Sequence, residues 1–403
     1  LKTICQLLLS KTNSQTRFQH VFPSYPHCWG RSGWLALGQN LKKKGMSFTL
    51  FESDASPSVR AQGYRIRIAG GGAEGLRECL DDKLFSLFET TCAETKPPTE
   101  GGRFNAMNAD SMESLFPNGA TAGIAKGLGP AEGPPGKPKM GGPGVFSKPY
   151  TVDRTMLRNV LLLGQEDHVK FNKSFTHYET TFTGVTAFLS DGTSERGTLL
   201  LLPNIRYVDT LSRVIIGKTP FTEELIAPLK WMTAIQDQSL TLFMEPVRFP
   251  KDTSVETNGR VLGGNAETFG LSDSEFHNLS GKDVADLILK LTSHWDPSFK
   301  AIFELHNTAQ GAPLRLSPSA NVVLMGDAIH AMMPAGGSGA NTALGDASLL
   351  GRIIAKKGVS EGSMTTFVDQ MWEYALPAIK GSLEAGKKLL GFKGFESSKE
   401  VTI

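Results

Sequence analysis

The sequence has few cysteines and no long hydrophobic run, and its charges nearly cancel. Only four of the 403 residues are cysteine, without a CxxC pair or regular spacing, which argues against a disulfide scaffold or a zinc site. The longest apolar runs, such as residues 199–202, are far shorter than the ~20 residues that span a bilayer. The net charge of +2 lacks the clustered basic face that nucleic-acid binding requires. We therefore expect a soluble protein of the cytoplasm without a metal centre, a transmembrane segment or a nucleic-acid partner.

Glycine, in contrast, is abundant, with 43 residues among 403. Residues 117–149 hold nine glycines and seven prolines, a density that favours a long loop, either mobile or a functional lid. A second cluster lies at residues 63–75, and a third, of six glycines, at residues 326–351. Only the third cluster also carries the other residues that a cofactor site needs.

The hydrophobic periodicity alternates between helical and strand patterns. Helices are expected at residues 35–44, 155–163, 283–291, 342–355 and 365–390. Strands are expected at residues 47–51, 64–68, 175–181, 185–189, 198–202 and 321–325, with Asp191-Gly192 as a hairpin turn. This mixture of βα units and antiparallel strands predicts an α/β protein with a second, sheet-based domain.

The third glycine cluster follows an apolar strand that ends at Gly326 and presents Asp327 at its carboxyl end, where ligands bind in open α/β sheets. A carboxylate there can accept strong hydrogen bonds from ligand hydroxyls. Pro334, Gly337 and Gly339 then form a turn into a helix whose positive end suits an anionic group. A flavin fits both halves, with its ribityl hydroxyls at Asp327 and its N1–C2=O edge at the helix start. The alternative is a plain turn between strand and helix.

This segment resembles the G-D-A-x-H-x-x-x-P-x-x-G-x-G-x-N-x-x-x-x-D-A signature of FAD-dependent aromatic-ring monooxygenases, the salicylate-hydroxylase and para-hydroxybenzoate-hydroxylase-like flavoproteins. The matching residues are Gly326, Asp327, His330, Pro334, Gly337, Gly339, Asn341 and Asp346. The resemblance implies that Asp327 binds the ribityl chain. It also implies that the loop contacts the isoalloxazine ring, through Pro334, Gly337, Gly339, Ala340 and Asn341. His330 alone is more typical of a packing or hydrogen-bonding residue, and no catalytic side chain is assigned.

Two more positions match the family. Residues 150–158, Tyr-Thr-Val-Asp-Arg-Thr-Met-Leu-Arg, resemble its strand-to-helix element, in which Arg154 takes the place of an arginine that contacts FAD. Glu52 ends the strand at 47–51, where an acid can hold the adenosine ribose hydroxyls. The alternatives are a surface arginine at a helix start and a solvated carboxylate at a strand end.

The glycine fingerprint expected before the helix at 35–44 is damaged. Counting back from Glu52 reaches Trp29, Arg31 and Trp34, and a shift by one finds Gly30 and Gly33 but no first glycine. Residues 22–27 contain two prolines and cannot form a buried parallel strand, so the preceding strand is predicted to be absent. The abrupt return to family-like sequence at residue 35 suggests an altered reading frame or exon upstream.

Two other features bear on nucleotide binding. Residues 70–75 satisfy G-x-G-x-x-G, but they follow Glu52 and a strand that alternates charged and apolar residues, so we interpret the string as a decoy. The family's D-G element is missing after Leu202, where Pro203 follows at once. In the family that element contributes to flavin and nicotinamide handling.

The resemblance implies an α/β fold with a discontinuous, Rossmann-like FAD-binding domain and an inserted mixed-sheet substrate domain. The predicted boundaries are 28–75, 150–205 and 316–360 for the FAD-binding domain, 76–149 for a helix and the Gly/Pro-rich loop, 206–315 for the substrate domain and 361–403 for a C-terminal helical tail.

The function implied is that of an FAD-dependent, NAD(P)H-requiring monooxygenase. It would hydroxylate an aromatic or polyketide-like small molecule with molecular oxygen, through a flavin hydroperoxide. The alternative is a non-catalytic or truncated flavin-binding homologue that has lost the pyrophosphate loop.

Overall fold

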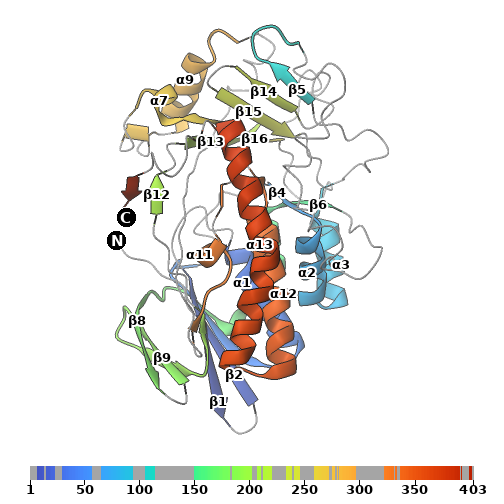
Figure 1. Ribbon diagram of the computed structural model, residues 1–403, viewed down its shortest axis with the longest axis vertical. Coiled ribbons are helices and arrows are strands. Elements are labelled where there is room, and N and C mark those ends of the chain that lie inside the picture. The colour runs from blue at the N-terminus through green and yellow to red at the C-terminus, as the bar shows by residue number, and fades with distance from the viewer. Residues whose placement is uncertain are drawn as a thin grey trace.

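The structure is a computed structural model with a six-stranded sheet near one end, a five-stranded sheet near the other, and a long helix, α13, running between them (Figure 1). It describes residues 7–12, 15–22, 30–56, 65–93, 105–113, 149–181, 184–201, 207–209, 212–219, 233–237, 240–245, 258–271, 275–276, 279, 281–295, 322–330, 332–333, 336–390, 392 and 399–401.

The six-stranded sheet is assembled from segments far apart in the sequence. Its order is β17 (Val322–Val323), β11 (Leu200–Leu201), β1 (Leu7–Thr12), β2 (Gln15–Phe22), β3 (Ser47–Glu52) and β7 (Val169–Lys170). Strand β1 is antiparallel to β2 and β11, whereas the pairs β2–β3, β3–β7 and β11–β17 are parallel.

A parallel strand does precede the first helix, so the prediction that it is absent was wrong. Residues 17–22 of β2 pair in parallel with residues 47–52 of β3, and α1 (Gly30–Lys43) connects the two strands. Pro23 comes after the last residue of β2, and its missing N–H is therefore not needed in the ladder. The strand lies further upstream than the family spacing suggested, and residues 23–29 lie outside the described part of the chain.

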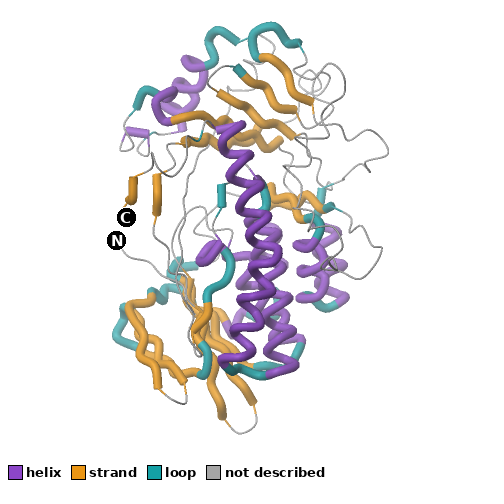
Figure 2. Tube along the Cα trace, in the orientation of Figure 1, coloured by secondary structure: helices purple, strands orange, loops and turns teal. Residues whose placement is uncertain are grey.

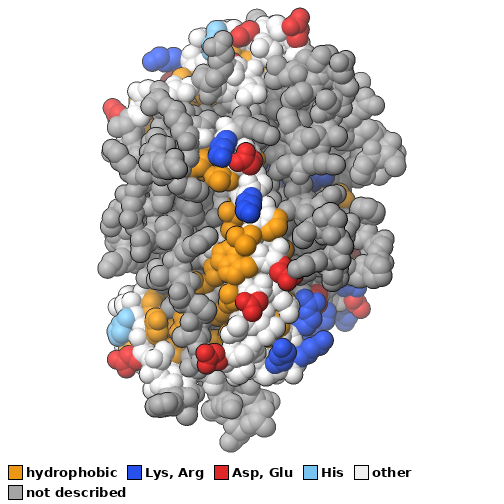
Figure 3. Space-filling model, viewed as in Figure 1, with side chains coloured by type: hydrophobic (Ala, Val, Ile, Leu, Met, Phe, Trp, Pro, Cys, Tyr) orange, Lys and Arg blue, Asp and Glu red, His pale blue; other side chains and the backbone are white. Residues whose placement is uncertain are grey.

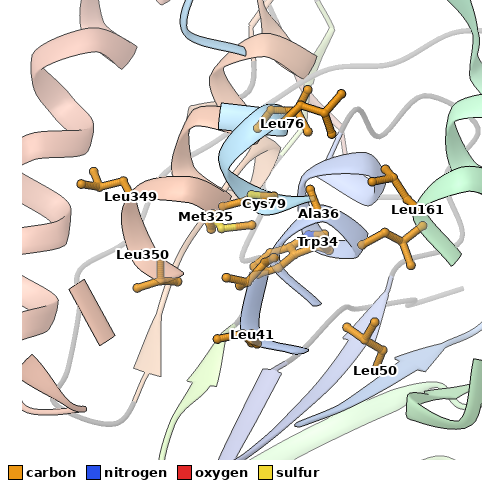
Figure 4. Packing of buried hydrophobic residues seen from close by; sticks show 14 of the residues in the cluster. Trp34, Ala36, Leu41, Leu50, Leu76, Cys79, Leu161, Met325, Leu349 and Leu350 are labelled. Carbon is orange, nitrogen blue, oxygen red and sulfur yellow. The ribbon is translucent and has the colours of Figure 1, made fainter. Parts of the chain in front are cut away.

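Helices α1, α2 (Gly71–Cys79) and α12 (Gly339–Lys357) pack together beside this sheet. Figure 4 shows Leu41, Cys79 and Leu350 from the three helices around the buried Met325. Burial raises the pKa of the Cys79 thiol to about 12, so the thiol belongs to the core. Next to them are α3 (Asp82–Thr91), α5 (Arg154–Leu162), the short helix Glu166–His168 and the antiparallel pair β4 (Arg65–Ile68) and β6 (Tyr150–Asp153).

The remaining strands form antiparallel and mixed sheets (Figure 2). A three-stranded sheet contains β8 (Phe175–Thr181), β9 (Gly184–Leu189) and β10 (Ser194–Gly197). The five-stranded sheet has the order β13 (Ser212–Thr219), β16 (Asn258–Asn265), β15 (Leu240–Glu245), β14 (Thr233–Gln236) and β5 (Asn105–Asn108), with α7 (Ala266–Phe269) and α9 (Gly281–Leu291) beside it. The predicted turn at Asp191-Gly192 is present, with Gly192 at φ +81°.

Helix α13 (Glu361–Leu390) contacts α12 and also strands β15 and β16 of the five-stranded sheet. Its outer face carries apolar surface (Figure 3), on which Leu376 is 39% exposed. Two strands, β12 (Tyr207–Asp209) and β18 (Lys399–Val401), form a separate antiparallel pair.

The α/β class and the helical C-terminal region are confirmed, whereas the domain boundaries stay predictions. Among the described helices none is long and apolar enough to cross a membrane.

Candidate functional site

The loop after β17 presents Asp327 at the carboxyl end of a buried parallel strand. Val322 and Val323 pair with β11, and Leu324 and Met325 continue the chain through the core. Gly326 has φ +65°, a backbone conformation that favours glycine. The turn places Asp327, partly exposed, as the first residue of the short helix α11 (Asp327–His330).

Asp346 on α12 ties this loop to the core. Its Oδ2 accepts hydrogen bonds from the Gly326 amide at 2.8 Å and from His330 Nε2 at 2.6 Å, and its Oδ1 accepts one from the Tyr374 hydroxyl at 2.6 Å. The side chains of Asp346 and His330 are both 0% exposed. One buried carboxylate therefore holds the residue before α11 and the last residue of α11.

The charges around Asp346 set the protonation of its partners. Burial by itself lowers the pKa of His330, but the carboxylates of Asp346 and Asp327 outweigh it and raise the pKa above its usual value. Burial and the Asp346 carboxylate raise the pKa of Tyr374 well above its usual value. His330 therefore holds a proton more readily than an exposed histidine does, and the Tyr374 hydroxyl stays a donor.

The start of α12 offers unused amide donors. Gly337 has φ +59° with open space where a side chain would begin, and Ser338, at the N-cap, makes no side-chain capping bond. The first backbone bond runs from Thr342 N–H to the Ser338 carbonyl. Within the described residues, the N–H groups of Gly339, Ala340 and Asn341 have no acceptor. This end of a 19-residue helix can therefore bind an electron-rich group.

The side chain of Asn341 points to a different partner. Its Oδ1 accepts a hydrogen bond from Ala69 N–H at 2.8 Å, and its Nδ2 donates to the Arg67 carbonyl at 2.9 Å. The amide thereby joins the start of α12 to the end of β4. A contact of Asn341 with a cofactor would use the backbone, because the side chain is already engaged.

The glycines at 70–75 allow two helices to approach closely. A Cβ on Gly72 would lie 2.6 Å from Asn341 Cα, and one on Gly75 would lie 2.6 Å from the Leu344 carbonyl oxygen. The preceding strand β4 pairs antiparallel with β6 and is not part of the parallel ladder. This context supports the interpretation of the G-x-G-x-x-G string as a decoy.

Gly75→Ala is expected to lower the free energy of unfolding by about 1–3 kcal/mol, because the new methyl group meets the α12 backbone. The matched control is Gly381→Ala inside α13, where nothing lies within 4 Å of the new Cβ. That change should raise the free energy of unfolding by up to ~1 kcal/mol. Denaturant unfolding measures both, and equal effects would contradict the packing role of Gly75.

Glu52 lies at the end of β3 and is 3% exposed. Its Oε1 accepts a hydrogen bond from Asp54 N–H at 3.0 Å, and Arg158 lies 3.6 Å from its Oε2 and 4.0 Å from Asp54 Oδ2. Arg154 is the first residue of α5, directly after the N-cap Asp153, whose side chain accepts from the amides of Thr155 and Met156. The two carboxylates and Arg158 form a second polar cluster, at the carboxyl edge of β3.

Some predicted features lie outside the described residues: Pro334, the loop from 117 to 148, and the residues 202–206 where the D-G element is missing.

Two residues of the site, Arg158 and Tyr374, were not predicted from the sequence. Arg158 follows Arg154 by four residues, one helical turn, a spacing that could have revealed it. Tyr374 lies on another helix, 28 residues after Asp346, without a motif around it.

Known proteins resemble the chain in sequence and in fold. A family model for an FAD binding domain matches residues 314–365. A dual O-methyltransferase/FAD-dependent monooxygenase of Phaeosphaeria nodorum is 31% identical over 82% of the chain, which spans 40% of that relative's length. Among solved structures, an FAD-containing monooxygenase of Photorhabdus luminescens is 25% identical with a TM-score of 0.68, covering 91% of this chain and 98% of the other. HpxO of Klebsiella pneumoniae, complexed with FAD and uric acid, has a TM-score of 0.62 at 17% identity, over 89% of each chain.

Proposed function

From its resemblance to FAD-dependent monooxygenases in sequence and in fold, we propose that the chain uses NAD(P)H and molecular oxygen to hydroxylate an aromatic or polyketide-like small molecule. Because the chain spans only 40% of the relative from Phaeosphaeria nodorum, the activity, substrate and partners of the whole protein are part of the proposal.

The proposal rests on two features of this site: the partly exposed carboxylate of Asp327 and the unused amide donors at the start of α12. A partly exposed carboxylate can accept hydrogen bonds from the ribityl hydroxyls. The amides of Gly339, Ala340 and Asn341 can stabilise negative charge at the pyrimidine edge of the ring. These two donor and acceptor sets fit a flavin.

Two more positions complete the proposed cofactor site. Glu52, held by Asp54 N–H and close to Arg158, would receive the adenosine ribose hydroxyls. Arg154, at the start of α5, would contact the cofactor from the side of β6. When bound, FAD supplies hydride acceptance and oxygen activation, while the protein orients the reactants.

For the substrate, we propose a planar aromatic compound bound beside the five-stranded sheet, of which β13, β14, β15 and β16 lie in the predicted substrate domain at 206–315. Hydroxylation needs electron density on the substrate ring, which phenolic compounds provide. The uric acid in the HpxO complex, a flat heteroaromatic molecule, is consistent with this choice.

The test begins with the purified chain. Bound flavin, seen as a yellow protein or as uptake of added FAD, is the first expected result. The second is NADPH or NADH oxidation that depends on oxygen and is stimulated by a phenolic compound, with a hydroxylated product identified by mass spectrometry.

Two other outcomes would change the conclusion. A protein that takes up no FAD would favour the alternative, a non-catalytic homologue without a working pyrophosphate loop. A protein that binds FAD and consumes oxygen but releases only hydrogen peroxide with every phenolic compound tested would be an oxidase and would contradict the hydroxylation.

A further inference from the structure

We propose that α13 positions the cofactor loop, acting through Tyr374 and Ser382 as two separate attachments. The loop consists here of the described residues 326–330, 332–333 and 336–338. This inference rests on the proposed function, because it assigns the loop to FAD binding. Neither Tyr374 nor Ser382 belongs to the signature that the sequence shares with the monooxygenase family.

The first attachment acts through Asp346. The Tyr374 hydroxyl donates to Asp346 Oδ1 at 2.6 Å, while Oδ2 of the same carboxylate accepts from the Gly326 amide and from His330 Nε2. Because Tyr374 bonds to one oxygen and the loop bonds to the other, Tyr374 fixes the rotation of the carboxylate that holds Gly326 and His330. Asp327 lies between Gly326 and His330 in the chain, so its direction depends on the same carboxylate.

The second attachment is direct. Ser382 Oγ accepts a hydrogen bond from the Met333 amide at 3.2 Å. The backbone at Gly336 comes so near that a Cβ there would lie 2.7 Å from Ser382 Cα, and a Cβ on Gly386 would lie 2.6 Å from Met333 Cε. The second half of the loop, at Met333 and Gly336, therefore packs directly against α13.

The two attachments lie on one helix. Tyr374 and Ser382 are eight residues apart, about 12 Å along an α-helix, with Pro377 between them. Ser382 contacts the loop directly, and Tyr374 acts on it through Asp346. The same helix also contacts β15 and β16 of the five-stranded sheet (Figure 1). One helix thus joins the cofactor loop to the sheet beside which we propose that the substrate binds.

The experiment compares Tyr374→Phe and Ser382→Ala with the unchanged protein. Tyr374→Phe removes only a hydroxyl, and the loss of a bond to a charged group is expected to raise the FAD dissociation constant about tenfold. Ser382→Ala removes a neutral bond and should raise the constant about threefold. In the protein without flavin, both variants should show faster hydrogen exchange in peptides covering residues 322–340.

The matched control is Ser363→Ala. Ser363 is also buried on α13, but its hydroxyl bonds to Ser360 at the helix start, away from the loop. It should lower the melting temperature while leaving the FAD dissociation constant and the exchange at 322–340 unchanged. If Tyr374→Phe and Ser382→Ala behave like this control, α13 has only a structural role and the inference is wrong.

Failure of this inference and failure of the proposed function give different results. If the unchanged protein takes up no FAD, the proposed function fails, yet hydrogen exchange in the flavin-free protein still shows whether Tyr374 and Ser382 hold the loop. If the protein binds FAD and neither variant changes affinity or exchange, the proposed function stands and the support by α13 is refuted.

Discussion

Asp327→Ala is expected to raise the dissociation constant for FAD about a hundredfold or more, with the fold retained. The ribityl chain would lose its charged acceptor, and two hydrogen bonds to a carboxylate contribute about 3 kcal/mol or more. Because Asp327 is partly exposed, its removal leaves room for water. Titration of the flavin-free protein with FAD, followed by fluorescence, measures the affinity, and circular dichroism checks the fold.

Two further variants serve as controls for Asp327→Ala. Asp327→Asn keeps one carbonyl oxygen without the charge and should fall between the unchanged protein and Asp327→Ala. Asp369→Ala removes an exposed carboxylate of α13 and should have no effect on FAD affinity. If Asp327→Ala bound FAD as tightly as the unchanged protein, the ribityl chain would not lie at this strand end.

Asp346→Leu should lower the free energy of unfolding by about 3–5 kcal/mol, because it leaves a buried charged partner without its counter-ion. The Gly326 amide, His330 and the Tyr374 hydroxyl would all lose their acceptor in the core. A loss of this size can prevent folding altogether. Chemical unfolding followed by tryptophan fluorescence measures the change, and a loss under 1 kcal/mol would contradict the role of Asp346.

Asp346→Asn removes the charge and replaces one of the two acceptor oxygens with an NH2 donor, so the pH dependence of its effect is what reports on the charge. The pKa of His330 is raised in the folded protein by Asp346 and Asp327, against the effect of burial. A group with a raised folded pKa contributes its full stability below the ordinary histidine pKa of about 6.5 and loses it as pH rises through the folded value. The stability difference between the unchanged protein and Asp346→Asn should therefore be largest near pH 6 (roughly) and shrink at alkaline pH. A difference independent of pH would show that His330 is neutral in the fold.

Local sequence patterns predicted most of the elements around the site. The helix expected at 342–355 is observed as Gly339–Lys357, and the strand expected at 47–51 as Ser47–Glu52. Asp327 was expected at the carboxyl end of a buried strand, and that is where it lies. These predictions succeeded because periodicity and turn residues act between near neighbours in the chain.

Pairing between distant segments was harder to predict. The prolines at 23 and 26 exclude a strand only at the residues nearest α1, whereas the parallel ladder of β2 lies upstream of them. Asn341 was expected to contact the cofactor as part of the loop, and its side chain also bonds to the backbone of Arg67 and Ala69, which the sequence did not predict. Its partners are more than 270 residues away, and no local pattern encodes such a distance.

The sequence by itself determined the α/β class, the flavin signature at 326–346 and the carboxylate at the strand end, since each depends on residues that are neighbours in the chain. The tertiary structure alone decided which groups hold that signature in place. Asp346 and Ser382 bond to the loop, and Tyr374 bonds to Asp346, because α11, α12 and α13 pack against one another. Burial makes these few hydrogen bonds consequential, because a polar group removed from water must find its partner inside the protein.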